Sequence, residues 1–189
     1  MLTHRVPHSA KAHLRLSLQR GIRMVITYGG KTPKIGDGCF LAGDADLIGD
    51  VEIGRDSSVW FHAVVRADQG AVRIGEQTNV QDGCIVHMDP GRTVQIGSRV
   101  TIGHGAIIHG CTVEDDCLIG MGATLMNGCH IGRNCIIGAG ALVTQDVRIP
   151  EGSLALGVPA RVVRQITEAE RESIRANAAR YRQEAQEYM

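Results

Sequence analysis

Aliphatic residues recur with a period of six along most of this 189-residue chain, and this period constrains the fold more than any other feature. An amphipathic helix needs apolar residues three and four apart, and a half-buried strand needs them two apart, so neither element explains the period. It fits a coil of three short strands per turn, in which each aliphatic side chain points into a narrow prism. The repeating positions are Ile35, Leu41, Leu47, Ile53, Val59, Val65, Ile74, Val80, Val86, Ile96, Ile102, Ile108, Val113, Ile119, Leu125, Ile131, Ile137, Val143 and Ile149.

Glycine directly follows many of these residues, as in Ile53-Gly54 and Ile131-Gly132, and would allow corners that a larger residue would crowd. The Ile-Gly repeats resemble those of hexapeptide-repeat proteins, whose fold is the left-handed parallel β-helix. One turn takes about eighteen residues, so residues 35–150 would make about six to seven turns. The expected fold class is an all-β solenoid, a left-handed parallel β-helix of hexapeptide repeats with a C-terminal α-helix packed along it.

The composition argues against several classes of partner. Lys plus Arg and Asp plus Glu number 20 each, so the formal net charge of zero gives no general attraction to nucleic acid or acidic membranes. No apolar run approaches the length of a transmembrane helix, and no signal peptide is recognisable. We therefore expect no nucleic acid partner, no membrane partner and a cytoplasmic location.

The two ends of the chain differ from the repeats, which we assign to a β-helix domain of residues 24–160. Residues 1–23 are basic and contain no Asp or Glu, which is typical of a disordered extension, of an upstream start, or of an amphipathic organelle-targeting segment. We assign residues 161–189 to the C-terminal α-helix, with Thr167 and Glu170 as a capping box. The face that packs on the prism would consist of Ile174, Ala178, Tyr181 and Ala185.

Most of the six cysteines keep a constant distance from the repeat. Those that lie four positions after a repeating aliphatic residue are Cys39, Cys84, Cys117, Cys129 and Cys135. Cys111 lies beside the one shortened step. A free cysteine packs as a small hydrophobic residue, so we interpret these residues as corner fillers rather than as metal or redox sites.

Three histidines can be placed with the same count. His87 and His109 each directly follow the aliphatic residue of the third strand, in consecutive turns. Their imidazoles would point outward from one face, one strand spacing of about 4.8 Å apart, which allows them to share a metal ion. His104 follows Ile102 by two and belongs to the second face, out of reach of that ion within one chain.

The three histidines could bind one metal if the third face of one subunit met the second face of another. A closed ring of three subunits offers both faces at every contact and would contain three identical sites. Three imidazoles leave one position open, as in a catalytic zinc site. The remaining histidines, which share no such register, are His4, His8, His13, His62 and His130.

Other polar residues interrupt the repeat near these histidines. Arg66 falls on the third face and would form a salt bridge with Asp68 across a subunit interface. Asn79 and Gln81 flank the inward Val80, and an amide there could hydrogen-bond a hydroxide or bicarbonate at the metal. Gln81 is the best candidate for a direct chemical role.

Together these segments resemble the γ-class carbonic anhydrase family over about residues 25–185. The segments that carry the resemblance are Val65-Arg66-Ala67-Asp68, Asn79-Val80-Gln81-Asp82, His87, Ile102-Gly103-His104-Gly105 and Ile107-Ile108-His109-Gly110-Cys111. The resemblance implies that His87 and His109 of one subunit bind zinc together with His104 of its neighbour. Iron and cobalt are alternative metals.

The resemblance also implies an activity, the reversible hydration of carbon dioxide to bicarbonate by a metal-bound hydroxide at trimer interfaces. The implied catalytic residues are Gln81, Asn79 and Tyr181, and the residues implied to support the interface and the site are Arg66, Asp68 and Asp82. Gln81 would orient hydroxide or bicarbonate. Tyr181 matches a tyrosine that approaches the metal pocket from the C-terminal helix in similar short members, although packing on the prism explains it equally well.

One departure from the family bears on activity. The archetype carries an acidic loop with a glutamate that passes protons to solvent, whereas the loop here is the short Met88-Asp89-Pro90-Gly91-Arg92, in which only Asp89 could substitute. Proton export limits fast hydration, so the enzyme could be slow or could use another substrate. Two alternatives therefore stay open. One is a hexapeptide-repeat acyltransferase or thioesterase that acts on CoA esters, and the other is a metal-binding structural subunit without turnover.

Overall fold

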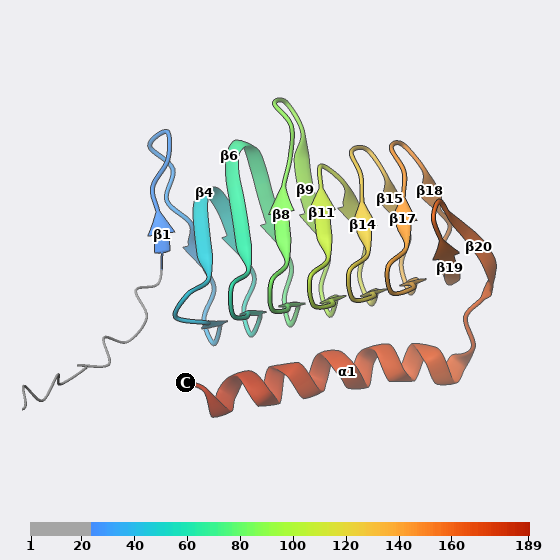
Figure 1. Cartoon of the computed structure of the whole chain (residues 1–189). Coiled ribbons are helices and arrows are strands. Elements are labelled where there is room, and N and C mark those ends of the chain that lie inside the picture. The colour runs from blue at the N-terminus through green and yellow to red at the C-terminus, as the bar shows by residue number, and fades with distance from the viewer. Residues whose placement is uncertain (1–23) are drawn as a thin grey trace, which may run out of the picture.

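The computed structural model describes residues 24–189, so the interpretation of residues 1–23 lies outside the described range. From Met24 to Gly157 the chain winds into a parallel β-solenoid of about 7 turns, which confirms the expected fold class (Figure 1). Each turn contributes one short strand to each of three faces. Strands of one face pair in parallel with those one turn away.

The strands follow the order that the period predicts. The first face contains β2 (Lys34–Ile35), β9 (Thr93–Ile96), β12 (Thr112–Val113), β15 (His130–Ile131) and β18 (Arg148–Ile149). The second face contains β3 (Phe40–Leu41), β5 (Ser58–Val59), β7 (Asn79–Val80), β10 (Thr101–Ile102), β13 (Leu118–Ile119), β16 (Ile136–Ile137) and β19 (Ser153–Gly157). The third face contains β1 (Met24–Ile26), β8 (Ile85–His87), β11 (Ile107–His109), β14 (Thr124–Leu125) and β17 (Leu142–Val143). Two longer strands, β4 (Asp46–Ile53) and β6 (Val64–Ile74), run from the third face onto the first face of the next turn.

The core is the column of repeating aliphatic side chains. Leu47, Ile102 and Leu125 are fully buried, as are most of the others. Ile35 differs from the sequence-based expectation because it is 37% exposed: it lies in the first turn, where no earlier strand of that face covers it. At the other end, β19 adds a strand beyond Pro150, and its buried Ala155 continues the column.

Small side chains fill the corner between the first and second faces and hydrogen-bond along the coil. Each of the donors Cys39, Ser57, Thr78, Cys117 and Cys135 reaches a backbone carbonyl one turn further on, at distances of 3.1, 2.8, 2.8, 3.1 and 3.1 Å. All the cysteines are free, and all except Cys39 are buried. Burial raises the pKa of the Cys84 thiol to about 11. These observations support a packing role for the cysteines.

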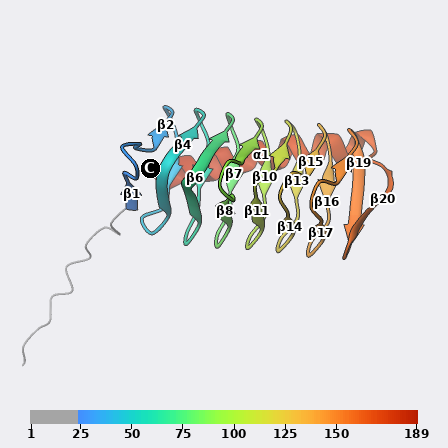
Figure 2. The ribbon, with the colours of Figure 1, turned by 90° about the horizontal axis from the view of Figure 1, so that it is seen from above.

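The C-terminal segment turns back and runs along the coil (Figures 1 and 2). Residues Ala160–Gln165 form strand β20, antiparallel to β19, and helix α1 then spans Glu168–Glu187. The predicted capping box of Thr167 and Glu170 is present. The helix packs against β10, β7 and β5 of the second face, so the C-terminus lies near the first turns. Within residues 24–189, no helix combines the length and apolarity needed to cross a membrane.

Aromatic side chains gather beneath the C-terminal end of α1, outside the narrow prism. Trp60 packs against Tyr181 and Tyr188, with ring centroids 5.5 Å apart in both pairs. Phe40 and Phe61 complete the cluster against Tyr188. Because edge-on aromatic contacts are directional, this cluster fixes the position of the helix and of Tyr181 above the second face.

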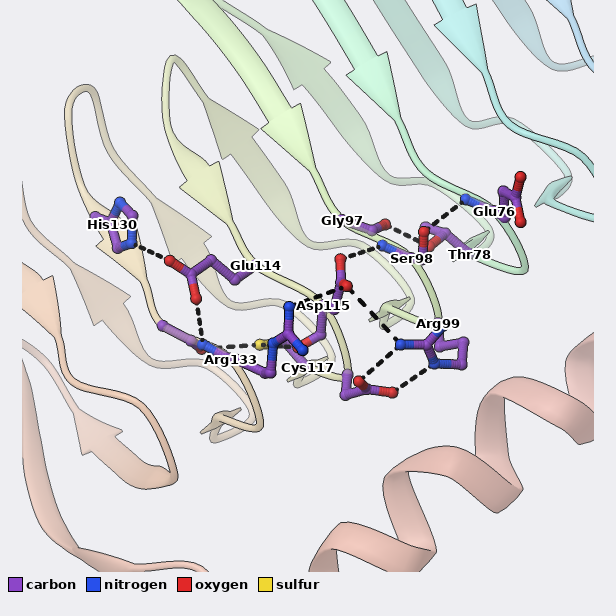
Figure 3. Close-up of polar contacts among 12 residues, drawn as sticks. Glu76, Thr78, Gly97, Ser98, Arg99, Glu114, Asp115, Cys117, His130 and Arg133 are labelled. Atoms are coloured by element: carbon purple, nitrogen blue, oxygen red, sulfur yellow. Dashed lines mark hydrogen bonds and ion pairs between the residues drawn. The ribbon is translucent and has the colours of Figure 1, made fainter.

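Ion pairs connect successive turns at the corner between the first and second faces (Figure 3). Arg99 donates to both carboxylate oxygens of Asp116 at 2.7 and 2.9 Å. The hydrogen bond from Arg99 outweighs burial and lowers the pKa of Asp116. Arg133 extends the series with a contact of 3.4 Å to Asp115.

Candidate metal centre

His87 and His109 end the neighbouring third-face strands β8 and β11. The two strands pair with His109 opposite His87, one turn apart, as the period predicts. Side chains alternate along a strand, so the buried Val86 and Ile108 direct both imidazoles outward. The ring centroids lie 5.3 Å apart, and Nδ1 of His87 lies 3.3 Å from Nε2 of His109.

A hydrogen-bond acceptor occupies the other nitrogen of each ring. Nε2 of His87 lies 3.1 Å from Oδ1 of Asp68. Nδ1 of His109 lies 3.1 Å from Oδ1 of Asn127, whose amide nitrogen donates to Asp89 at 2.6 Å. In neutral rings this network assigns both protons to the outer nitrogens. The two nitrogens that face each other then carry lone pairs and share no proton.

Facing lone pairs at this separation repel each other, and a metal cation bound by both nitrogens would relieve the repulsion. Zinc–nitrogen bonds of about 2.0–2.1 Å in tetrahedral geometry place two ligand nitrogens about 3.3 Å apart. The distance between Nδ1 of His87 and Nε2 of His109 is 3.3 Å. The pair therefore fits two of the ligands of a zinc ion.

His104 lies in the turn after β10, apart from this pair. Its Nδ1 lies 2.8 Å from Oδ2 of Asp82, so the ring proton is held by the carboxylate and Nε2 is left with its lone pair. The phenol oxygen of Tyr181 lies 3.4 Å from that Nε2. The His104 side chain is 45% exposed, whereas that of His87 is 17% exposed.

Gln81 and Asn79 form a buried chain of amides behind His104. Oε1 of Gln81 accepts the backbone N–H of His104 at 3.1 Å. Nε2 of Gln81 donates to Asn79 at 3.0 Å, and Asn79 donates to Thr101 at 3.0 Å. Thr101 also accepts a hydrogen bond from Asn177 of α1 at 3.0 Å. The two amides thus position His104 and connect it to the helix.

Arg66 pairs with Asp68 within one chain, whereas the sequence led us to expect a bridge across a subunit interface. Burial opposes ionisation of Asp68, but the hydrogen bonds from Arg66 and His87 outweigh it and lower the pKa of Asp68. Asp68 is therefore a carboxylate held against His87. A role of Arg66 at an interface stays a prediction.

Sequence reasoning did not single out Asn127. Asn127 lies two residues after Leu125, whereas His109 lies one residue after Ile108. Because the step from Ile108 to Val113 is shortened, counting does not reveal that Asn127 and His109 lie in neighbouring turns. Asp89, considered as the one acidic residue of its loop, has Oδ1 3.9 Å from Nε2 of His109 and a side chain that is 56% exposed. The loop between β8 and β9 that carries Asp89 rises above the neighbouring turns (Figure 1).

No single chain brings the three histidines together. Within residues 24–189, no group of three or more His, Cys, Asp and Glu side chains is arranged to hold a metal ion. Two exposed apolar residues lie on the same strands as the histidine pair. Ile85 and Ile107 point to the outer side of β8 and β11 and are 44% and 37% exposed. Adjacent exposed apolar side chains on paired strands are typical of a contact surface.

Comparisons with known proteins agree with this architecture. The family model described as bacterial transferase hexapeptide (six repeats) matches residues 32–67 and 110–145. The solved structure of a hexapeptide transferase family protein from Anaplasma phagocytophilum superposes with a TM-score of 0.85 at 35% identity, over 88% of this chain and 99% of that one. Fold and repeats together define a hexapeptide-repeat β-helix protein.

Relatives in sequence narrow the class further. A protein of Methanocaldococcus jannaschii named probable carbonic anhydrase is 56% identical, over 75% of this chain and 89% of its own length. Carbonic anhydrase of Geobacillus kaustophilus is 41% identical, over 77% of this chain and 80% of its own length. Gamma carbonic anhydrase 1, mitochondrial, of Arabidopsis thaliana is also 41% identical, over 93% of this chain and 66% of its own length. The chain belongs to the γ-class carbonic anhydrase family.

Proposed function

We propose that the protein is a zinc enzyme that interconverts carbon dioxide and bicarbonate at the interfaces of a homotrimer. His87 and His109 of one subunit would bind the metal with His104 of its neighbour, and iron or cobalt are alternatives to zinc. The observation that carries the proposal is the pair of facing ring nitrogens of His87 and His109, 3.3 Å apart, with hydrogen-bond acceptors at both outer nitrogens. Membership of the γ-class carbonic anhydrase family supports the reaction.

His104 has the properties that a third ligand requires. Asp82 holds the Nδ1 proton, which leaves the lone pair of Nε2 directed away from the carboxylate. Each of the three imidazoles then has an acceptor at its outer nitrogen, and such an acceptor fixes the tautomer and orientation of a metal-bound histidine. The exposure of His104 would allow a second chain to approach it.

The apolar surface beside the histidine pair supports subunit contact at this place. Burial of Ile85 and Ile107 against a neighbour would remove exposed apolar area from water at the edge of the metal site. A contact between two different faces is heterologous and can close into a ring. A ring of three would contain three equivalent sites, each with ligands from two chains.

The chemistry divides between the metal and the residues around it. Bound zinc would supply a water-derived nucleophile at neutral pH. Gln81 uses one amide hydrogen for Asn79, and its second would orient an oxygen of carbon dioxide or bicarbonate. Burial raises the pKa of Tyr181, so its phenol stays protonated and could donate to the same oxygen. Asn79 is a positioning residue that acts through Gln81.

A complementation experiment tests the shared site. His104→Ala and His109→Ala chains are each expected to lose bound metal and carbon dioxide hydration. After the two variants are refolded together in equal amounts, an intact site forms wherever a subunit with both His87 and His109 meets one that has His104. Random assembly into trimers predicts about a quarter of the wild-type metal content and hydration rate. Metal analysis and stopped-flow hydration measure both quantities.

The matched control mixes His87→Ala with His109→Ala chains. Both substitutions affect the ligand pair that one subunit supplies, so this mixture should recover neither metal nor activity. Metal retained by His104→Ala alone, or equal recovery in the two mixtures, would contradict the assignment.

A groove beside His104 supports a second candidate function, acyl transfer or hydrolysis of CoA esters with His104 as general base. The groove lies between the second face and α1 and has a volume of about 560 Å³. Leu118, Met121 and Ile136 line it, and Tyr181 lies at its helix side. Turnover of acyl-CoA thioesters by metal-free protein would favour this function. Stoichiometric metal without either activity would instead favour a metal-binding structural subunit.

The cytoplasmic location and the role of residues 1–23 stay predictions.

A further inference from the structure

A polar hollow of about 320 Å³ lies at the corner between the third and first faces, immediately after His109 in the chain. Its floor is the backbone of two stacked corners, residues 110–112 and 128–130. Arg92 and Arg148 are part of its lining, and none of the described residues that line it is an Asp or Glu.

Two glycines in the floor make room for Arg92 and for the neighbouring side chains of Asn127 and Asp146. A Cβ atom at Gly110 would lie 2.0 Å from Oδ1 of Asn127 and 3.3 Å from Cδ of Arg92, and one at Gly128 would lie 2.0 Å from Oδ1 of Asp146 and 3.2 Å from Nη1 of Arg92. Any larger residue at either position would therefore clash with Asn127 or Asp146 and also crowd the arginine. The guanidinium of Arg92 consequently reaches over the floor as far as the second corner.

Arg148 enters the hollow from strand β18. This strand pairs with β15 so that Arg148 lies next to His130 on the first face. Glu114 is the acid nearest in sequence to the floor residues, and it is bound to Nε2 of His130 at 2.8 Å and to the backbone of Arg133 at 2.9 Å. It is therefore engaged with residues other than Arg92 and Arg148. Asp146 also brings a carboxylate oxygen to Gly128, but its Oδ2 accepts a hydrogen bond from Gln145 at 3.2 Å, and within residues 24–189 it forms no ion pair with either arginine.

Within residues 24–189, neither Arg92 nor Arg148 forms an ion pair or a side-chain hydrogen bond. By contrast, Arg99 and Arg133 on the next corner both pair with carboxylates. Two unpaired guanidinium groups that line one small polar hollow favour an anion between them. Their planar forks suit an oxyanion, which can accept parallel hydrogen bonds from each.

We propose that this hollow is a binding site for bicarbonate. The choice of bicarbonate rests on the proposed function, because this anion would be formed or consumed beside His109. The hollow begins at Gly110, the next residue in the chain. It would therefore hold bicarbonate close to the metal site as the anion arrives or leaves.

Titration with ¹³C-labelled bicarbonate, followed by NMR at constant ionic strength, tests the proposal. The His104→Ala chain serves as the background, so that binding at the proposed metal centre does not contribute. Arg92→Gln and Arg148→Gln are each expected to weaken binding about tenfold, because each removes a charge-assisted hydrogen bond. Arg161→Gln is the matched control, since Arg161 is an exposed arginine outside the hollow whose side chain donates to the carbonyl of Ala160, and binding should not change.

Competition by phosphate, with no competition by chloride at equal ionic strength, would support an oxyanion site. Unchanged affinity in the Arg92→Gln/Arg148→Gln double variant, or equal competition by chloride, would overturn it. The test is separable from the proposed function. If bicarbonate binding depends on the arginines but the protein does not hydrate carbon dioxide, the binding site is supported and the proposed enzyme activity is refuted. If the protein hydrates carbon dioxide but binding does not depend on the arginines, the activity is supported and the binding site is refuted.

Discussion

The phenol oxygen of Tyr181 lies 3.4 Å from Nε2 of His104, although the two residues are 77 positions apart in the sequence. The ring of Tyr181 also packs edge-on against Trp60, with centroids 5.5 Å apart. One side chain of α1 therefore serves packing and contacts a candidate metal ligand. This arrangement connects the position of the helix to the electronic environment of His104.

Replacement of Tyr181 by Phe separates the two roles. Tyr181→Phe keeps the ring against Trp60, so the free energy of unfolding should change by less than about 0.5 kcal/mol. Loss of one hydrogen bond worth about 1 kcal/mol should lower the hydration rate about fivefold in a stopped-flow assay. Tyr188→Phe, in the same aromatic cluster, is the control. Equal losses of activity in the two variants would argue against a role of the Tyr181 hydroxyl at the site.

The carboxylate of Asp68 should determine how strongly His87 binds metal. Asp68→Asn removes the charge that holds the Nε2 proton of His87, and loss of such a partner typically lowers metal affinity about 10–100-fold. Competition with a chelator of known affinity measures the change. Asp44→Asn disrupts the exposed contact of Asp44 with His62 and should leave zinc affinity unchanged. An Asp68→Asn chain with wild-type affinity would show that Asp68 does not orient the ligand.

Ser57 and Ser153 occupy equivalent corner positions but differ in their partners. Oγ of Ser57 donates to the carbonyl of Gly75 at 2.8 Å and accepts the N–H of Thr78 at 3.1 Å. Within residues 24–189, Oγ of Ser153 is buried without a partner, because the coil ends there and offers it no carbonyl one turn further on. Ser57→Ala should lower the unfolding free energy by about 1–3 kcal/mol, and Ser153→Ala should leave it unchanged or raise it. Urea unfolding of both variants provides the comparison, and similar losses would contradict the hydrogen-bond account.

The pair of Arg99 and Asp116 should make stability depend on pH. The hydrogen bond from Arg99 lowers the pKa of Asp116, so the stabilisation is present above the unfolded value of about 3.9 and is lost as pH falls through the lower folded pKa. Arg99→Gln should therefore reduce the unfolding free energy by about 1 kcal/mol near pH 7 and by much less near about pH 2.

Urea unfolding at several pH values measures this difference. Arg55→Gln is the matched control, because Arg55 pairs with Glu76 in an exposed contact, with side chains 66% and 47% exposed. Its effect should stay below about 0.5 kcal/mol at every pH. A pH-independent difference between wild type and Arg99→Gln would contradict the assignment to Asp116.

Much of the fold could be predicted because its information is periodic. The position of a residue relative to the repeating aliphatic residues predicts which face of the coil it lies on. Counting residues along the repeat therefore predicts that His109 stacks on His87 one turn away. The helix start was equally local, since Thr167 and Glu170 form their capping box within one turn. Asn127 was missed because the corner in which it lies, between Leu125 and Ile131, is one residue longer than the corner between Ile108 and Val113, and the regular count does not detect such a change.

The sequence by itself determined the solenoid, its three faces and the separation of His104 from the histidine pair, because a period of six has few other physical solutions. Only the tertiary structure decided which atoms meet: the acceptor at each ring, the pairing of Arg66 with Asp68 inside one chain, and the contact of Tyr181 with His104. Such contacts depend on side-chain rotamers and on corner lengths, and these are set by packing between turns and by the helix laid across them.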